Sequence, residues 1–134
     1  MFMLDTDICV YVMNERHEAL TATFAEHAHE ICISAVSHAE LWFGAEHSAH
    51  VERNRSQLDD FLRDLDVRPF GVEAGQHYGR IRELLTRRGT PIRANDLLIA
   101  AHARSMGATL VTNNSREFGR VPDLETVSWA RCAP

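Results

Sequence analysis

The chain has 134 residues, 45% of them hydrophobic and 25% charged, which is an ordinary globular composition and excludes a disordered or fibrous protein. The 14 basic residues are outnumbered by 19 acidic ones, and the net charge of −5 excludes a protein that binds nucleic acid through positive charge over its whole surface. Every basic residue is an arginine, which excludes any mechanism that requires a lysine.

Short apolar segments alternate along the chain with segments of helical periodicity. The segment 51–65 carries leucine and phenylalanine at spacings of three and four, and 95–106 is apolar on nearly every side, as in a buried helix. Gly89 and Gly107 are expected to end helices. In chain order we expect a strand at 2–4, helices at 8–13 and 18–27, a strand at 31–33, helices at 34–46 and 51–65, a strand at 66–70, helices at 72–88 and 95–106, a strand at 108–112 and a weak last strand at 125–128.

The expected strands are short, continuous apolar runs that do not alternate with polar residues. This pattern is typical of a parallel sheet covered by helices on both faces, so we expect one α/β domain over residues 1–134. No apolar run approaches the roughly 20 residues of a membrane helix, and the first 13 residues contain aspartates and no basic region. We therefore expect no membrane association and a cytoplasmic protein.

The cysteines and histidines show no spacing typical of a metal site. The three cysteines are too far apart for a disulfide framework and are expected to be buried small side chains or a free thiol near the end. Two histidine pairs are closely spaced but have no further ligand at a zinc-like spacing. The residues concerned are Cys9, Cys32 and Cys132, and the pairs His27 with His29 and His47 with His50.

Acidic and amide side chains follow the expected strands. Asp5 stands at the end of the first strand, Glu40 in the helix after the second, and Asp96 at the start of the buried helix, while Asn114 and Glu117 follow the fourth strand. Ligand sites in parallel α/β folds form at the carboxyl ends of strands. Gathered carboxylates need neutralisation, and Mg²⁺ supplies it through one or two direct carboxylates and several waters. The pattern favours a metal site.

Each of these residues also has a structural interpretation, and taken singly that interpretation is the commoner one. Asp5 is a good cap for the helix that follows it. The segment 37–40 has the form of a capping box with Glu40 at its end, and Asp96 favours a helix start. The shared position of all these residues at strand ends is what favours a site.

Several segments together resemble a known family, in order and in spacing. They are 3–8 (MLDTDI), 33–36 (ISAV) leading to Glu40 and Gly44, 95–103 (NDLLIAAHA), and 110–114 (LVTNN) followed by Glu117 and Phe118. They resemble the PIN-domain ribonucleases, and the total length is similar to that of the VapC toxins of bacterial type II toxin–antitoxin systems. The resemblance covers essentially the whole chain.

The resemblance implies a PIN-like three-layer α/β/α sandwich with a central parallel sheet of four to five short strands. It implies an endoribonuclease that uses Mg²⁺ or Mn²⁺ to activate a water, with transfer RNA among its plausible substrates. It also implies a homodimer that a VapB-like antitoxin holds inactive. In this reading Asp5 and Asp96 face the metal, Glu40 completes the catalytic site, and Thr6 and Thr112 line the pocket.

Position 114 departs from the family pattern, because many members have Asp where this chain has Asn114. An amide carries no charge, so Asn114 is expected to line the pocket and Glu117 to act as the fourth catalytic acid in its place. We therefore expect one bound metal ion.

Two further groups of residues have both a functional and a structural interpretation. The arginines that precede Asp96 are candidates for RNA binding, or form a solvated helix face. Trp42 and Phe43 are core residues, or belong to a surface where an antitoxin helix docks. The arginines are Arg80, Arg82, Arg87, Arg88 and Arg93.

Two other functions compete with a nuclease. The segment 5–7 (DTD) after a strand resembles the nucleophile motif of haloacid-dehalogenase-type phosphotransferases, but that chemistry, like that of receiver domains, needs a lysine that the chain lacks. The remaining alternative is a PIN-like RNA-binding module that is catalytically weak or inactive, which Asn114 favours.

Overall fold

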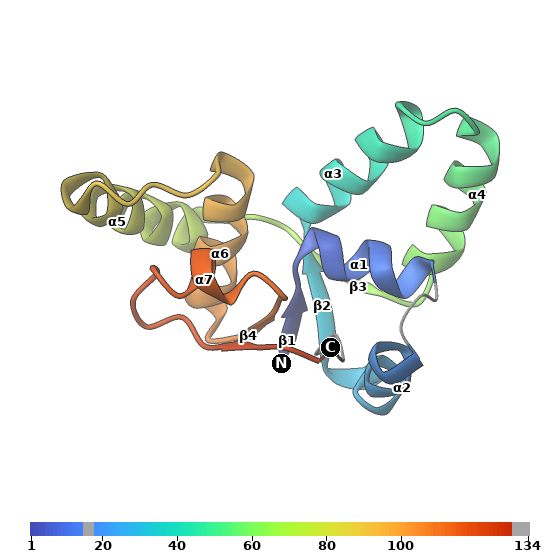
Figure 1. The fold of residues 1–134 in the computed structure, drawn as a ribbon, viewed down its shortest axis with the longest axis horizontal. Helices are drawn as coiled ribbons and strands as arrows, with labels where there is room; N and C mark the ends of the chain where they lie inside the picture. The colour runs from blue at the N-terminus through green and yellow to red at the C-terminus, as the bar shows by residue number, and fades with distance from the viewer. Residues whose placement is uncertain (15–17, 130–134) are drawn as a thin grey trace.

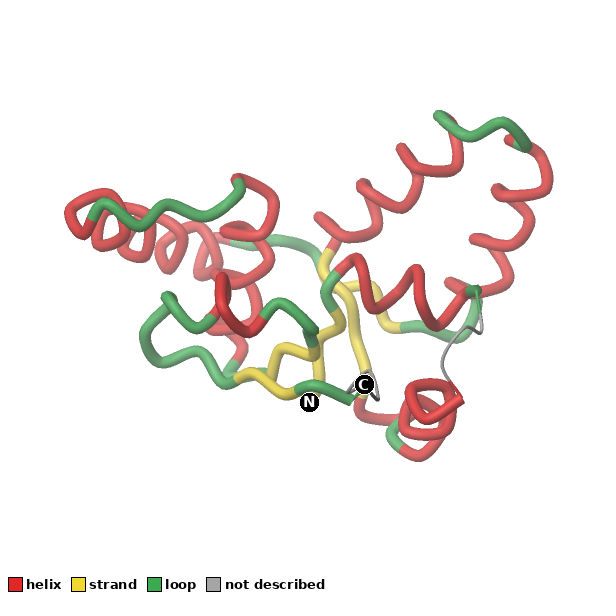
Figure 2. Tube along the Cα trace, in the orientation of Figure 1, coloured by secondary structure: helices red, strands yellow, loops and turns green. Residues whose placement is uncertain are grey.

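A parallel sheet runs through the middle of the molecule (Figures 1 and 2). The computed structural model describes residues 1–14 and 18–129, and over these residues five strands pair in the order β3-β2-β1-β4-β5, all parallel. The central strand is the first in the chain, with Met3 opposite both Cys32 and Leu110. The strands are β1 (Phe2–Leu4), β2 (Ile31–Ser34), β3 (Asp66–Arg68), β4 (Thr109–Val111) and β5 (Thr126–Val127).

Helices cover both faces of the sheet, α5 to α7 on one side and α1, α3 and α4 on the other (Figure 1). Among the described residues no helix has both the length and the apolar composition that crossing a bilayer requires. The helices are α1 (Thr6–Met13), α2 (Glu18–Glu26), α3 (Ala35–Glu46), α4 (Val51–Leu62), α5 (Val72–Arg88), α6 (Ala94–Met106) and α7 (Ser115–Phe118), with a 3₁₀ turn η1 at Ala28–Glu30.

Alternate residues of the strands pack into two separate hydrophobic cores, one on each face of the sheet. Met3 and Leu110 pack with Ile81, Leu97 and other residues of α5 and α6. Their neighbours Leu4 and Val111 pack on the other face with α1, α3 and α4. This division follows from the strand geometry, because successive side chains point to opposite faces of a sheet. The predicted three-layer α/β/α sandwich with a short-stranded parallel sheet is confirmed.

The predicted elements are present, with small differences at their ends. The third strand stops at Arg68 because the next residue, Pro69, has no N–H for a ladder. The fourth helix ends at Leu62 rather than residue 65. As predicted, Gly89 and Gly107 end helices, both in the left-handed conformation.

The structural interpretation of 37–40 as a capping box is wrong. The helix begins at Ala35, close to the predicted start at 34, and its cap is Ser34, whose side chain accepts from Val36 N at 3.1 Å. Ser37 therefore lies inside the helix, which leaves Glu40 free of a capping role.

Both cysteines in the described part of the chain behave as predicted. Cys9 and Cys32 are buried free thiols, and burial raises the pKa of Cys32 to about 11. Cys132 lies outside the described residues.

Candidate active site

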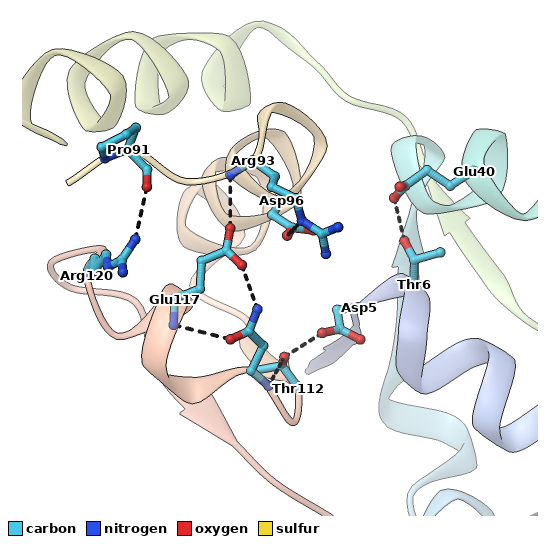
Figure 3. Close-up of polar contacts among 10 residues, drawn as sticks. Asp5, Thr6, Glu40, Pro91, Arg93, Asp96, Thr112, Glu117 and Arg120 are labelled. Atoms are coloured by element: carbon cyan, nitrogen blue, oxygen red, sulfur yellow. Dashed lines mark hydrogen bonds and ion pairs between the residues drawn. The ribbon is translucent and has the colours of Figure 1, made fainter. Parts of the chain in front are cut away.

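Three acidic side chains that are far apart in the sequence line one pocket at the carboxyl ends of the strands. Asp5 comes directly after β1, Glu40 projects from α3, and Asp96 stands in the first turn of α6 (Figure 3). The pocket has a volume of about 310 Å³. Its lining consists of Asp5, Thr6, Asp7, Glu40, Arg93, Ala94, Asn95, Asp96, Asn114 and Phe118.

Asp5 is both a helix cap and a pocket residue. It is only 5% exposed, and its Oδ1 accepts from Ile8 N at 2.9 Å at the start of α1. Its Oδ2 accepts a short hydrogen bond from the hydroxyl of Thr112, a residue that follows β4. Burial, with smaller contributions from the Asp7 and Glu40 carboxylates, raises the pKa of Asp5 to about 6 against the lowering effect of these hydrogen bonds. Capping and pocket roles thus coexist in one side chain.

Asp96 faces the same pocket from the N-terminus of α6. Its side chain is 17% exposed, and Arg93 Nε lies 3.3 Å from its Oδ2. Burial and then the neighbouring Glu117 raise the pKa of Asp96 to about 6, although Arg93 acts in the opposite direction. Two carboxyl groups in one pocket therefore both resist ionisation.

These residues fit a divalent cation. A cation between Asp5 and Asp96 would relieve the cost of ionising two buried carboxyls. Within residues 1–14 and 18–129, no three histidine, cysteine or acidic side chains are already grouped as a metal site. Mg²⁺ does not require such a group, because it binds through one or two carboxylates and keeps several waters.

Glu40 is held by hydroxyl groups. The Thr6 hydroxyl donates to Glu40 Oε1 at 2.6 Å, and the hydroxyl of the fully buried Ser37 lies 3.0 Å from the same Thr6 oxygen. Ser37 was not predicted at the site; its position one turn before Glu40 on α3 is the signal that could have found it. Thr6 links the start of α1 to α3 and fixes the Glu40 carboxylate on one side of the pocket (Figure 3).

The remaining predicted residues form a connected group beside the pocket. Thr112 is buried and accepts from Asn114 N at 2.9 Å while it donates to Asp5. Asn114 lines the pocket, and its Nδ2 donates to Glu117 Oε2 at 2.6 Å. Glu117 Oε1 accepts from Arg93 N at 2.9 Å. Thr112 and Glu117 are not among the lining residues and reach the pocket through these partners.

The predicted RNA-binding arginines are not all at the pocket. Arg93 lines it, but Arg82, Arg87 and Arg88 lie on the exposed side of α5. Arg82 Nη1 donates to Tyr78 Oη at 2.9 Å, and Arg87 pairs with Glu83 at 2.6 Å. The structure thus places one arginine beside the acidic residues and the others on the adjoining helix.

Asp7 and Asn95 line the pocket but were not predicted as site residues. The only sequence feature that could have indicated them is their nearness to predicted site residues, because Asp7 is two residues after Asp5 and Asn95 directly precedes Asp96. Trp42 packs against the core and donates to His38 Nε2 at 3.2 Å. Phe43 is 67% exposed, so the core interpretation holds for Trp42 and not for its neighbour.

Comparisons with known proteins show what the whole chain is similar to. The PIN domain family matches residues 2–124. Ribonuclease VapC2 of Haemophilus influenzae is 42% identical over 128 residues, covering 96% of this chain and 97% of the relative. The tRNA(fMet)-specific endonuclease VapC of Shigella flexneri is 41% identical over 129 residues, covering 96% and 98%. The DNA-bound VapBC structure from Salmonella typhimurium superposes with a TM-score of 0.93 at 39% identity, covering 96% and 98%.

Proposed function

We propose, from the premise that the chain belongs to the PIN-domain family and is a ribonuclease of the VapC kind, where it cuts RNA and with which metal. The proposed site of hydrolysis is the pocket of Asp5, Glu40 and Asp96, with one Mg²⁺ ion. The observation that carries the proposal is the pair Asp5 and Asp96. The pKa of each is raised to about 6 by burial, and both line the same pocket. The relatives are named ribonucleases, which favours an enzyme over a non-catalytic RNA-binding module.

The protein's own residues have distinct tasks in this proposal. Asp5 and Asp96 would hold the ion, and Mn²⁺ would fit the same oxygen ligands. When bound, such an ion lowers the pKa of a coordinated water and screens the phosphate charge. Glu40, held by Thr6, orients the attacking water, and Arg93 faces the phosphate as a fork of N–H donors.

The reaction that these residues support is direct hydrolysis. The water oxygen bonds to phosphorus, the P–O3′ bond breaks, the water proton passes to a base or to solvent, and the departing O3′ takes up a proton from solvent. The expected products carry a 5′-phosphate and a 3′-hydroxyl. Attack by the neighbouring ribose hydroxyl would instead leave a 2′,3′-cyclic phosphate, so the chemistry of the fragment ends tests the proposal.

The names of the relatives support a proposal for the substrate and the partner. Two similar proteins, from Shigella flexneri and Salmonella typhimurium, are named tRNA(fMet)-specific endonucleases, and we propose transfer RNA as the substrate class. The similar solved structures are VapBC toxin–antitoxin complexes, so we propose a VapB-like antitoxin as inhibitor. The family resemblance is the basis for proposing a homodimer as the active unit. The exposed Phe43 is the candidate contact for the antitoxin.

The decisive experiment is cleavage of total RNA by purified chain freed of antitoxin, with Mg²⁺, with Mn²⁺ and with EDTA. We expect discrete fragments that require metal and that disappear in Asp96→Asn. Asp59→Asn, which removes a charge from the exposed face of α4, is the matched control and is expected to cleave normally. Cleavage that persists in EDTA, or at the parental rate in Asp96→Asn, would show that the chemistry lies elsewhere.

A further inference from the structure

Both carboxylate oxygens of Glu117 already have partners within the protein. Oε1 accepts from the main-chain N–H of Arg93 at 2.9 Å, and Oε2 accepts from Asn114 Nδ2 at 2.6 Å (Figure 3). Glu117 N in turn donates to Asn114 Oδ1 at 3.3 Å. Asn114 therefore binds both the side chain and the main-chain N–H of Glu117, and Glu117 is not among the residues that line the pocket.

The contact with Arg93 fixes the start of α6. Arg93 is the N-cap residue of this helix, its side chain makes no capping hydrogen bond, and its carbonyl accepts from Leu97 N at 2.9 Å. Asp96 stands three residues later, in the first turn. A carboxylate that holds the N–H of Arg93 therefore sets where the helix carrying Asp96 begins.

The same group of contacts reaches Asp5 from the other end. Asn114 N donates to Thr112 Oγ1 at 2.9 Å, and Thr112 donates to Asp5. An unbroken series of polar contacts and short chain segments thus connects Asp5, through Thr112, Asn114 and Glu117, to the helix start at Arg93. Hydrogen-bond networks of this kind fix the mutual orientation of the groups at their ends.

We propose that Asn114 and Glu117 form a clamp that positions Asp96 relative to Asp5, and that Glu117 is a positioning residue rather than a ligand of the metal ion. The proposal rests on the proposed function, because it assumes that Asp5 and Asp96 hold the ion. It reassigns Glu117 from the catalytic role expected from the sequence.

The clamp needs an amide at position 114. Nδ2 is a donor that the Glu117 carboxylate accepts, whereas an ionised carboxylate at that position has no donor to offer. Two carboxylates at this separation repel each other, and one of them would have to take up a proton. Asn114→Asp is therefore expected to break the clamp, although it adds an acid at the position where many family members have one.

The test exchanges the two functional groups. Asn114→Asp and Glu117→Gln are made singly and together. In the double variant the amide introduced at position 117 donates to the carboxylate introduced at position 114, and its carbonyl oxygen still accepts from Arg93 N. The measurements are Mn²⁺ affinity, kcat and KM for RNA cleavage, and the melting temperature of the metal-free chain.

We expect Asn114→Asp to lower kcat about tenfold or more and to leave Mn²⁺ binding no tighter, because a charge-assisted hydrogen bond is lost. The double variant should return to within about threefold of the parent kcat and should show positive coupling in melting temperature. Tighter Mn²⁺ binding by Asn114→Asp, or a double variant as impaired as Glu117→Gln, would overturn the clamp.

The two proposals fail in different ways. A parent chain that gives no metal-dependent cleavage would contradict the proposed function. The melting temperatures of the metal-free parent, the two single variants and the double variant would still show whether the two positions are coupled, and so would still test the clamp. Absence of that coupling, in a parent chain that cleaves RNA, would contradict the clamp alone.

Discussion

The hydroxyl of Thr6 donates a 2.6 Å hydrogen bond to Glu40 Oε1 and so joins the residue next to Asp5 to a carboxylate on another helix. This contact gives Thr6 a task that its position in the sequence did not reveal. Thr6 holds Glu40 in place from the start of α1, and the hydroxyl of the buried Ser37 contacts the Thr6 hydroxyl. The orientation of Glu40 thus depends on two hydroxyl groups.

Removing the Thr6 hydroxyl should slow cleavage. Thr6→Val keeps the shape of the side chain but loses the donor, and a hydrogen bond to a charged group contributes about 1.5–3 kcal/mol, or roughly 10- to 100-fold in kcat. Thr6→Ser keeps the donor and should recover most of the activity. Steady-state kinetics on a defined RNA would measure this, and equal activity of the two variants would show that the contact has no role in turnover.

Asp5→Asn should stabilise the metal-free fold at neutral pH while abolishing cleavage. Because burial raises the pKa of Asp5 to about 6, the folded state binds its proton more tightly than the unfolded state, and stability falls as pH rises from about 4 to 6. An amide removes this cost, and we expect a gain of about 1–3 kcal/mol above pH 6 that disappears below pH 4. Urea unfolding at pH 7.5 and 4 measures it.

The control for this prediction is Asp59→Asn, which removes an exposed charge on α4 and should change stability little at either pH. A loss of stability in Asp5→Asn at pH 7.5 would mean that the helix cap and the contact with Thr112 need the charge. Parental cleavage by the same variant would exclude Asp5 from the site.

His102 should make the folded state less stable as pH falls, whereas Asp5 makes it less stable as pH rises. It is 3% exposed, its Nδ1 lies 2.8 Å from Ser34 Oγ, and burial together with Arg68 lowers its pKa. The folded state therefore resists protonation of His102, and its contribution is complete above pH 6.5 and lost as pH falls below that value, by at most about 1.4 kcal/mol per pH unit. His102→Gln should remove this part of the pH dependence.

Since the two carboxyls and His102 titrate over overlapping ranges with opposite signs, the His102 measurement belongs in a chain that already carries Asp5→Asn and Asp96→Asn. Urea unfolding at pH 7.5 and 5 then compares this chain with and without His102→Gln. His50→Gln, at an exposed position, is the control. An unchanged pH dependence would show that His102 binds its proton equally well in the folded and unfolded states.

The arginines should differ in their effect on RNA binding. Arg93 lines the pocket, whereas Arg87 is paired with Glu83 on the exposed face of α5. Arg93→Gln is expected to raise KM several-fold and to reduce the slope of log KM against log salt by about 0.7, the loss of one phosphate contact on single-stranded nucleic acid. Arg87→Gln should change both less. The reverse order would place the RNA path along α5 rather than over the pocket.

Local sequence patterns were sufficient for the order of the five strands and six longer helices and for the positions of several pocket residues, but α7 and η1 were not predicted. The range 72–88 matches α5, and Asp5 and Asp96 were placed correctly at a strand end and a helix start. The apolar strand runs and the glycine helix ends carry this information because they act over a few residues.

Contacts between distant segments were not predictable in the same way. Ser34 and Ser37 are both acceptable caps, and the pairing of Ser34 with Arg68 at the end of β2 is consistent with Ser34 as the cap and Ser37 inside the helix. Likewise, the bond between Glu117 and Arg93 joins residues 24 positions apart and depends on the path of the chain between α5 and α6. The spacing of residues in the sequence does not predict the course of such a loop in space.

The central position of β1 has a consequence for how the enzyme comes into being. Its neighbour β4 begins at Thr109, and the bond between Thr112 and Asp5 spans 107 positions. A growing chain therefore carries Asp5 from the start but has no pocket until the segment around residue 112 has been made and has closed on it. Such distant pairings form late and slowly in folding. We therefore expect a chain that ends before residue 112 to lack a complete pocket and to leave RNA uncut.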